Sequence, residues 1–254
     1  MSKPKTVSFF EKYAVEYDRM TDSAAREPRH RDEVCALIDV LHPSSVLDAG
    51  CGTGLTVQLF AERDIAVVGI DSSAEMIRLA SERCARFGSL AGFATAQFES
   101  LPKSFGQKFD LIVCLANSLS GVPSVSVLKR SLKQFFGALK PGGSLVIQIL
   151  NPSVFQDGVP FPIKVSRHDQ LVYHRYALRL GDTICLHIVR TDLSKASPSF
   201  ETFVHTYQPL PAPKLSALLK SVGFGKAKMF GNLLLTEPFA AHSRDMVVIA
   251  RRTS

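Results

Sequence analysis

Two kinds of apolar periodicity divide the chain into parts. From Ser45 to Leu150, short apolar runs alternate with stretches in which apolar residues recur every three or four positions. Such an alternation of strands and helices is typical of a parallel sheet with right-handed crossovers. Before this region, residues 7–20 and 28–41 predict two helices, with Pro28 at the start of the second.

The periodicity changes to that of β-strands between about residues 161 and 208. Turn residues such as Gly181-Asp182 separate the runs, so we predict an antiparallel insertion. Its clearest strands are Leu171–Leu180, Thr183–Asp192 and Ser199–Tyr207. The chain then closes with a helix over Pro213–Ser221 that ends at Gly223, and with strands over Ala227–Phe230 and Met246–Ala250.

Length and composition suit one α/β domain, since the chain has 254 residues of which 46% are hydrophobic. We expect it to consist of N-terminal helices (1–43), an alternating core (44–150), the β insertion (160–209) and a closing helix and hairpin (210–254). No apolar run approaches the roughly 20 residues of a membrane-spanning helix, and residues 1–5 lead into no signal-peptide core. We therefore expect a soluble, cytoplasmic protein.

Five cysteines are scattered through the chain, without Cys-x-x-Cys pairs or neighbouring histidine clusters. An odd number of cysteines cannot pair completely. The sequence therefore predicts neither a disulfide scaffold nor a metal site.

The net charge of +7 is unevenly distributed along the chain. Residues 1–163 hold 17 basic and 17 acidic side chains, whereas residues 164–254 hold 13 and 6. Such an excess could attract an anionic substrate or a nucleic acid. The basic residues are spread along predicted strands, as on a solvated face, and no run of them interleaves with aromatic residues. Examples are Arg167, Arg175, Arg179 and Arg190.

A glycine-rich turn follows the first strand of the core. Val46-Leu47-Asp48-Ala49-Gly50-Cys51-Gly52-Thr53-Gly54 places three glycines at alternate positions, and Asp71 closes the next apolar run. This arrangement favours a nucleotide-containing cofactor. The dinucleotide fingerprint is Gly-x-Gly-x-x-Gly, and a carboxylate at position 48 would repel a pyrophosphate. S-adenosylmethionine has no phosphate and carries two cationic groups, so the turn favours that cofactor over a nicotinamide dinucleotide.

These residues and three further motifs resemble the class I S-adenosylmethionine-dependent methyltransferases. The further motifs are Val67–Ile77, Phe109–Cys114 and Leu139–Ile147, which occur in the order of that family's second, fourth and fifth strands. The resemblance implies a Rossmann-like, doubly wound, seven-stranded sheet whose last strand is antiparallel. It also implies S-adenosyl-L-methionine as the cofactor.

The resemblance implies a set of cofactor-binding residues along these motifs. One of them departs from the family's pattern, because Gln97 stands where an Asp usually accepts a hydrogen bond from the adenine amino group. A Gln carbonyl can accept the same bond, though more weakly than a carboxylate. Tyr17 corresponds to a Tyr of the family's lid helix that closes over the cofactor. The implied set is Tyr17, Asp48, Gly50, Gly52, Gly54, Asp71, Ser72, Met76, Gln97, Phe98 and Leu115.

The acceptor side of the site is less well defined by the sequence. Asn117-Ser118 resembles a segment of glycine-type and amino-sugar N-methyltransferases, but Gly121 stands where several of those enzymes have a His. We expect Tyr13, Asn117, Ser118 and Tyr176 to bind the acceptor. His205 and His174 are our candidate catalytic residues, and other titratable groups that could take a proton are His30, His168, His242, Asp157 and Glu201.

The sequence therefore predicts a methyltransferase that acts on a small molecule by in-line displacement, with nitrogen favoured over oxygen as the acceptor atom. Two alternatives stay open. The basic C-terminal third suggests a nucleic-acid (RNA) methyltransferase, and the lack of an evident base suggests a non-catalytic, cofactor-binding regulatory protein. The sequence predicts no membrane partner and leaves the oligomeric state open, a homodimer included.

Overall fold

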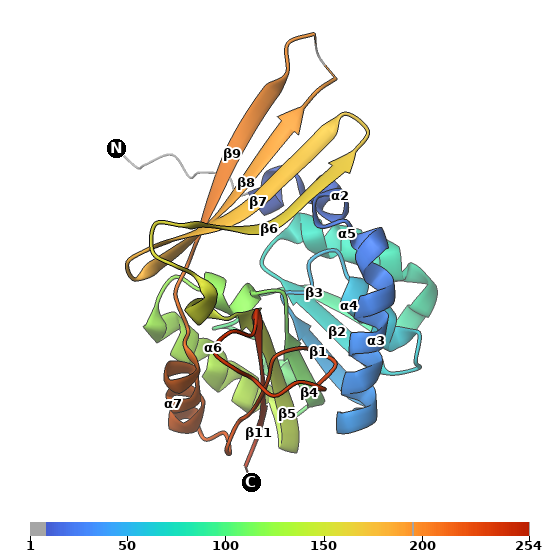
Figure 1. Ribbon diagram of the computed structural model, residues 1–254. Coiled ribbons are helices and arrows are strands. Elements are labelled where there is room, and N and C mark those ends of the chain that lie inside the picture. Colours follow the sequence, from blue (N-terminus) through green and yellow to red (C-terminus); the bar gives the residue numbers. More distant parts are fainter. Residues whose placement is uncertain (1–8, 195, 254) are drawn as a thin grey trace, which may run out of the picture.

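A computed structural model describes residues 9–194 and 196–253, and its centre is a seven-stranded sheet (Figure 1). The strand order is β10-β11-β5-β4-β1-β2-β3. All neighbouring pairs from β5 to β3 are parallel, whereas β11 is antiparallel to both β5 and β10. The predicted doubly wound sheet with an antiparallel last strand is confirmed. The strands are β1 (Ser45–Ala49), β2 (Ala66–Asp71), β3 (Ala91–Thr95), β4 (Phe109–Cys114), β5 (Leu139–Leu150), β10 (Lys228–Phe230) and β11 (Asp245–Arg251).

Helices cover both faces of this sheet and form two separate apolar clusters with it. One cluster joins the sheet to α6 (Val125–Ala138) and α7 (Ala212–Val222), through buried residues such as Phe135 and Leu219. The other joins it to α3 (Ser23–Leu41), α4 (Leu55–Ala61) and α5 (Ala74–Cys84). Because both faces are buried, the parallel strands are nearly continuous apolar runs. Short 3-10 helices complete the core: η2 (Ala85–Leu90), η3 (Lys103–Phe105), η4 (Ser118–Gly121) and η5 (Pro152–Val154).

The predicted insertion is a four-stranded antiparallel sheet in the order β6-β7-β8-β9. In Figure 1 it rises from the main sheet as a long twisted ribbon. Its inner face buries Tyr173 and Ile188 against Phe9 and Met20 from the N-terminal segment. The strands are β6 (Pro160–His168), β7 (Leu171–Leu180), β8 (Thr183–Asp192) and β9 (Ser199–Tyr207).

The N-terminal helices differ from the predicted ones. The expected helix over 7–20 is divided into α1 (Phe9–Lys12), η1 (Ala14–Glu16) and α2 (Tyr17–Thr21), and residues 7 and 8 lie outside the described part of the chain. Asp22 then adopts a left-handed conformation with φ of 53° and turns the chain into α3. α3 begins at Ser23, five residues earlier than predicted, and Pro28 lies inside it.

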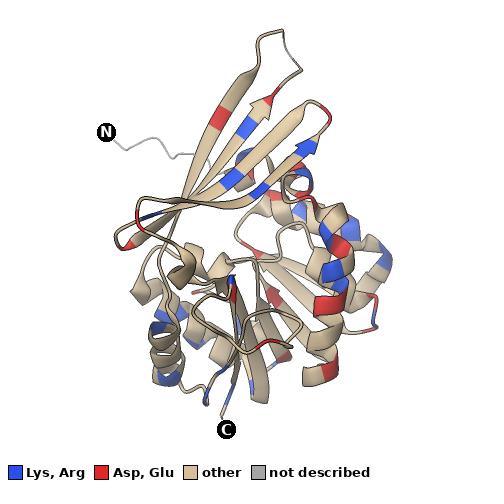
Figure 2. Cartoon of the chain, viewed as in Figure 1, with Lys and Arg blue, Asp and Glu red and all other residues tan. Residues whose placement is uncertain are grey.

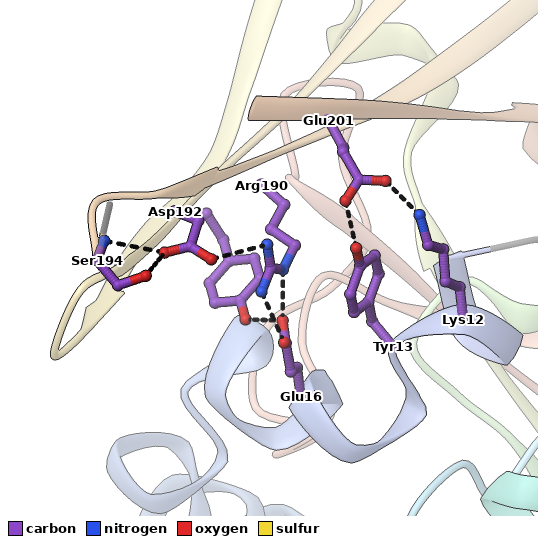
Figure 3. Close-up of polar contacts among 8 residues, drawn as sticks. Lys12, Tyr13, Glu16, Arg190, Asp192, Ser194 and Glu201 are labelled. Atoms are coloured by element: carbon purple, nitrogen blue, oxygen red, sulfur yellow. Dashed lines mark hydrogen bonds and ion pairs between the residues drawn. The ribbon is translucent and has the colours of Figure 1, made fainter. Parts of the chain in front are cut away.

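We call residues 9–21 the lid segment, and polar contacts join it to the insertion (Figure 3). Glu16 accepts hydrogen bonds from Nε and Nη2 of Arg190 at 2.8 and 2.9 Å, and it also accepts one from the Tyr173 hydroxyl. Glu201 on β9 accepts hydrogen bonds from Tyr13 and Lys12. Burial alone would raise the pKa of Glu16, but the bonds from Arg190 and Tyr173 hold this pKa below its ordinary value. These bonds attach the lid segment to the insertion, and Asp18, which accepts hydrogen bonds from the Thr53 hydroxyl at 2.7 Å and from Arg83, attaches it to the glycine-rich turn and α5.

Two further observations concern the chain as a whole. Among residues 9–194 and 196–253, no helix is both long enough and apolar enough to cross a membrane. The same part of the chain contains no group of three or more His, Cys, Asp or Glu side chains placed to hold a metal ion.

Candidate functional site

The glycine loop, residues 50–54, runs from the end of β1 to the start of α4. The amides of Gly50 and Cys51 both donate to the Ile70 carbonyl, at 2.8 and 2.9 Å, and so bind the loop to the end of β2. Asp71, the last residue of β2, accepts hydrogen bonds from the amides of Gly52 and Ser73 at 3.1 and 2.9 Å. The Asp71 carboxylate therefore connects the loop to the N-terminus of α5.

Close packing explains two of the three glycines. Gly50 has a φ of +85°, and a Cβ atom there would lie 2.7 Å from the Ser118 hydroxyl oxygen. Gly54 has a φ of +84°, and a Cβ atom there would lie 2.9 Å from Cβ and 3.1 Å from Cα of Ala80 on α5. Both positions need a conformation that L side chains rarely adopt and a space that a methyl group would fill.

We expect Gly54→Ala to lower the free energy of unfolding by about 2 kcal/mol, because alanine is strained in the left-handed region and its methyl group would push α5 away. Urea unfolding followed by circular dichroism measures this change. Gly137→Ala is the matched control, since a Cβ atom at this position in α6 would meet nothing within 4 Å. Equal unfolding curves for the two variants would contradict the expectation.

A cavity of about 410 Å³ opens above the glycine loop, and we call it the smaller cavity. It brings together residues from β2, the start of α5, the segment after β3 and the lid segment. Most of the predicted cofactor residues line it: Tyr17, Gly50, Gly52, Asp71, Ser72, Met76, Gln97 and Phe98. Ser118 and His205 line it as well.

A cavity of about 740 Å³, the larger cavity, lies next to the smaller one, between the main sheet and the inner face of the insertion. Asp48, Leu115 and Asn117 of the predicted set line it. Four residues line both cavities: Tyr17, Gly50, Ala116 and Tyr207. These four residues mark the junction at which molecules bound in the two cavities would meet.

Asp48 is an acidic group without a partner at the floor of the larger cavity. Only 2% of the residue is exposed, and its Oδ2 makes no hydrogen bond within the described part of the chain. Burial, with a smaller contribution from the charge of Asp71, raises the pKa of Asp48 to about 8. A buried carboxylate of this kind is well suited to a cationic ligand, which would offset its desolvation.

His205 lies in the smaller cavity, where its ring packs against Phe10 of the lid segment with a centroid distance of 4.6 Å. Burial lowers the pKa of His205, so the imidazole is neutral at pH 7. Its Nε2 atom is buried and has no hydrogen-bond partner among residues 9–194 and 196–253. A neutral imidazole with a free nitrogen can accept a proton or a hydrogen bond.

Several predicted site residues lie elsewhere. Side chains alternate along β7, and His174 and Tyr176 lie on the face opposite to the buried Tyr173 and Ala177, where Tyr176 stacks on His187. Neither of them lines the smaller or the larger cavity, and neither does Tyr13, whose hydroxyl donates to Glu201. Gly54 serves the packing of α5 instead of contacting either cavity.

Of the other candidate bases, His30 alone lines one of the two cavities. Its two ring nitrogens are already engaged, by Glu33 at 3.0 Å and by the Thr56 hydroxyl at 2.9 Å. His168, His242, Asp157 and Glu201 line neither cavity.

The sequence analysis missed three residues of the larger cavity: Arg26, Arg175 and Tyr207. The interpretation of the strand arginines as a solvated face is wrong for Arg175, whose Nε is buried, and for Arg190, whose side chain is only 12% exposed. Both share the inner face of the insertion with Tyr173 and Ile188, and the alternation of strand residues could have shown this. Burial raises the pKa of Tyr207 to about 12.

Comparisons with known proteins agree with this architecture. Residues 46–143 match the family model described as a methyltransferase domain. A demethylmenaquinone methyltransferase from Tropheryma whipplei (strain Twist) is 31% identical over 140 residues, which are 54% of this chain. These residues span only 56% of the length of that relative. A glycine/sarcosine N-methyltransferase from Halorhodospira halochloris is 24% identical over 91% of this chain and 84% of its own.

Solved structures share the fold over nearly the whole chain. An S-adenosylmethionine-dependent methyltransferase from Clostridium acetobutylicum ATCC 824 has a TM-score of 0.77 and 17% identity, covering 96% of this chain and 99% of that one. An amino pentose methyltransferase from Micromonospora echinaspora has a TM-score of 0.70 and 20% identity, and both chains are covered completely. The matched family model thus covers residues 46–143, and the fold of the whole chain is similar to that of these solved methyltransferases.

Proposed function

We propose that the protein transfers the methyl group of S-adenosylmethionine to a small-molecule acceptor in the cytoplasm. The observation that carries this proposal is the pair of cavities that meet at Tyr17, Gly50, Ala116 and Tyr207. The smaller cavity would hold the adenosine part of the cofactor and the junction its sulfonium, and the larger cavity would hold the cofactor's amino-acid part together with the acceptor. The five cysteines, none of which forms a disulfide in the structure, are compatible with a reducing compartment.

The residues of the smaller cavity have the chemistry to bind the adenosine part. Asp71 can accept hydrogen bonds from both ribose hydroxyls, and Gln97 can accept one from the adenine amino group. Met76 and Phe98 offer apolar contacts to the faces of the ring. Asp48 can compensate the positive charge of the cofactor, and Gly52, where a Cβ atom would meet no protein atom nearer than 3.6 Å, leaves the loop backbone accessible to the ligand.

Bound S-adenosylmethionine would supply an electrophilic methyl carbon. The acceptor atom attacks this carbon as the bond from carbon to sulfur breaks, so the protein mainly has to align the two molecules. The lid segment excludes water from the junction through Tyr17, which lines both cavities. We favour nitrogen as the acceptor atom, because the Asn117-Ser118 segment lies at the junction and the Halorhodospira relative, an N-methyltransferase by name, matches 91% of the chain.

Part of the charge distribution argues against the nucleic-acid alternative. Lys164 is paired with Asp22 and Arg190 with Glu16, so part of the basic excess is compensated within the chain. In the view of Figure 2, basic and acidic residues are interspersed over α3 and the insertion, whereas α6 and α7 carry basic residues only. The regulatory alternative also predicts binding of the cofactor, but it predicts no methyl transfer. An assay of methyl transfer therefore distinguishes it from our proposal.

Calorimetric titration with S-adenosylhomocysteine tests the cofactor, with NADH as the control. We expect micromolar binding of the first and none of the second. Incubation with S-adenosylmethionine that carries a labelled methyl group, and a panel of small amines and hydroxyl compounds, then tests transfer. Binding without any labelled product would support the regulatory alternative, and binding of NADH alone would overturn the proposal.

A further inference from the structure

Two arginines in the larger cavity have no acidic partner. Arg26 on α3 and Arg175 on β7 both line the cavity, and the Nε atom of each is buried without a hydrogen bond. Neither makes an ion pair with any residue in 9–194 or 196–253. A buried guanidinium without a partner is costly, so such groups mark places where a ligand completes the pairing.

The other cations of this cavity are already engaged, which distinguishes these two. Lys164 contacts Asp22 at 2.8 Å, and Arg29 contacts Glu33 at 3.1 Å. Arg244 is exposed and donates to the Ile163 carbonyl at 3.1 Å.

Arg175 lies near the junction of the two cavities. Burial is the main cause that lowers the pKa of Arg175, and the nearby charge of Arg26 lowers it further. Tyr17 and Tyr207, which line both cavities, are also near Arg175 and raise the pKa of its guanidinium. Two cations thus line the same cavity beside the junction, and an anion between them would relieve the desolvation of Arg175 and the repulsion between the two guanidinium groups.

We propose that the acceptor carries an anionic group, a carboxylate or a phosphate, that Arg175 binds within the larger cavity. A planar guanidinium can bind either group through two parallel hydrogen bonds. Because Arg175 lies beside Tyr17 and Tyr207, the anionic group is close to the atom that is methylated. This inference rests on the proposed function, since it assigns the larger cavity to the acceptor.

The same chemistry has a second source, because the amino-acid part of S-adenosylmethionine also carries a carboxylate. Arg26, on the lid side of the cavity, is the natural partner for that group, which leaves Arg175 for the acceptor. The two sources can be separated with S-adenosylhomocysteine, which has this carboxylate, and methylthioadenosine, which lacks it.

The test compares the wild type with Arg175→Gln, Arg175→Lys and a control, Arg179→Gln. Arg179 lies on the same strand but bonds to the Gly181 carbonyl at the turn. Protein saturated with S-adenosylhomocysteine is titrated with acetate, inorganic phosphate and the uncharged probe acetamide, with binding followed by ligand-observed NMR. Unfolding curves of all variants show whether each is folded.

We expect the wild type and Arg179→Gln to bind acetate or phosphate, but not acetamide, and Arg175→Gln to bind the anion about 10- to 100-fold more weakly. Arg175→Lys should keep part of the affinity, and whichever of acetate and phosphate binds better identifies the anion. Unchanged anion binding in Arg175→Gln would overturn the inference. So would a variant that loses affinity for S-adenosylhomocysteine but keeps it for methylthioadenosine, because Arg175 would then bind the cofactor. If the wild type binds no S-adenosylhomocysteine at all, the proposed function itself has failed. Titration of the unliganded protein with the same anions then still shows whether Arg175 binds them.

Discussion

Replacement of Asp71 by alanine should weaken the binding of S-adenosylhomocysteine about 1,000-fold, because two hydrogen bonds to an ionised carboxylate are lost in a partly buried site. The effect has a second component. Asp71 also accepts hydrogen bonds from the amides of Gly52 and Ser73, so its removal frees the glycine loop from the start of α5. Calorimetric titration of the variant measures the loss directly.

The control for this experiment is Asp39→Ala, which removes an exposed carboxylate from α3. It should leave the affinity unchanged. Asp71→Asn separates the two components, since its amide oxygen can keep one backbone bond while the charge is lost. If Asp71→Ala binds S-adenosylhomocysteine as tightly as the wild type, the smaller cavity does not hold the ribose.

Replacement of Asp48 by asparagine should stabilise the unliganded protein at alkaline pH, by on the order of 6 kcal/mol at pH 9. The pKa of Asp48 is raised from 3.8 to about 8 in the folded protein, chiefly by burial. Between these two pH values the folded state holds a proton that the unfolded state has released. The free energy of unfolding therefore falls as pH rises from about 4 to 8, and asparagine, which cannot ionise, removes this loss.

Melting temperatures of the wild type, Asp48→Asn and Asp39→Asn between pH 4 and pH 9 test this expectation. The curve of Asp48→Asn should separate from the others as pH rises and meet them near pH 4. The same variant should bind S-adenosylhomocysteine more weakly, since the ligand's ammonium loses its counter-charge. Parallel curves over the whole pH range would show that Asp48 ionises normally in the folded protein.

Much of the core could be predicted from sequence because its signals are local. Each parallel strand is a short apolar run, and the glycine loop and Asp71 stand out among their neighbours, so the doubly wound sheet with its antiparallel last strand could be predicted. Eight of the residues that we expect to bind the cofactor line the smaller cavity. The exceptions have equally local causes. Gly54 packs against Ala80 instead of a ligand, and the expected helix over 7–20 is interrupted at Tyr13, whose φ of −126° is not helical.

The larger cavity could not be predicted in the same way, because its walls come from segments that are distant in sequence. Arg26 and Arg175 are 149 positions apart by their numbering, and only the folded chain brings them to one cavity. Which face of β7 points inward depends on what packs against it. Tyr173 and Ala177 define that inner face, which places Arg175 inside and turns His174 and Tyr176 outward.

The contacts between lid segment and insertion limit how this protein can be redesigned. Glu16 pairs with Arg190 and Tyr173, and Tyr13 and Lys12 share Glu201, so charges of the lid segment are compensated by side chains of the insertion, and the reverse. A chimera that takes residues 160–207 from a relative with another substrate would leave the half-buried Glu16 without these partners. Residues 9–21 and the insertion should therefore be transplanted together, and they should also vary together among homologues.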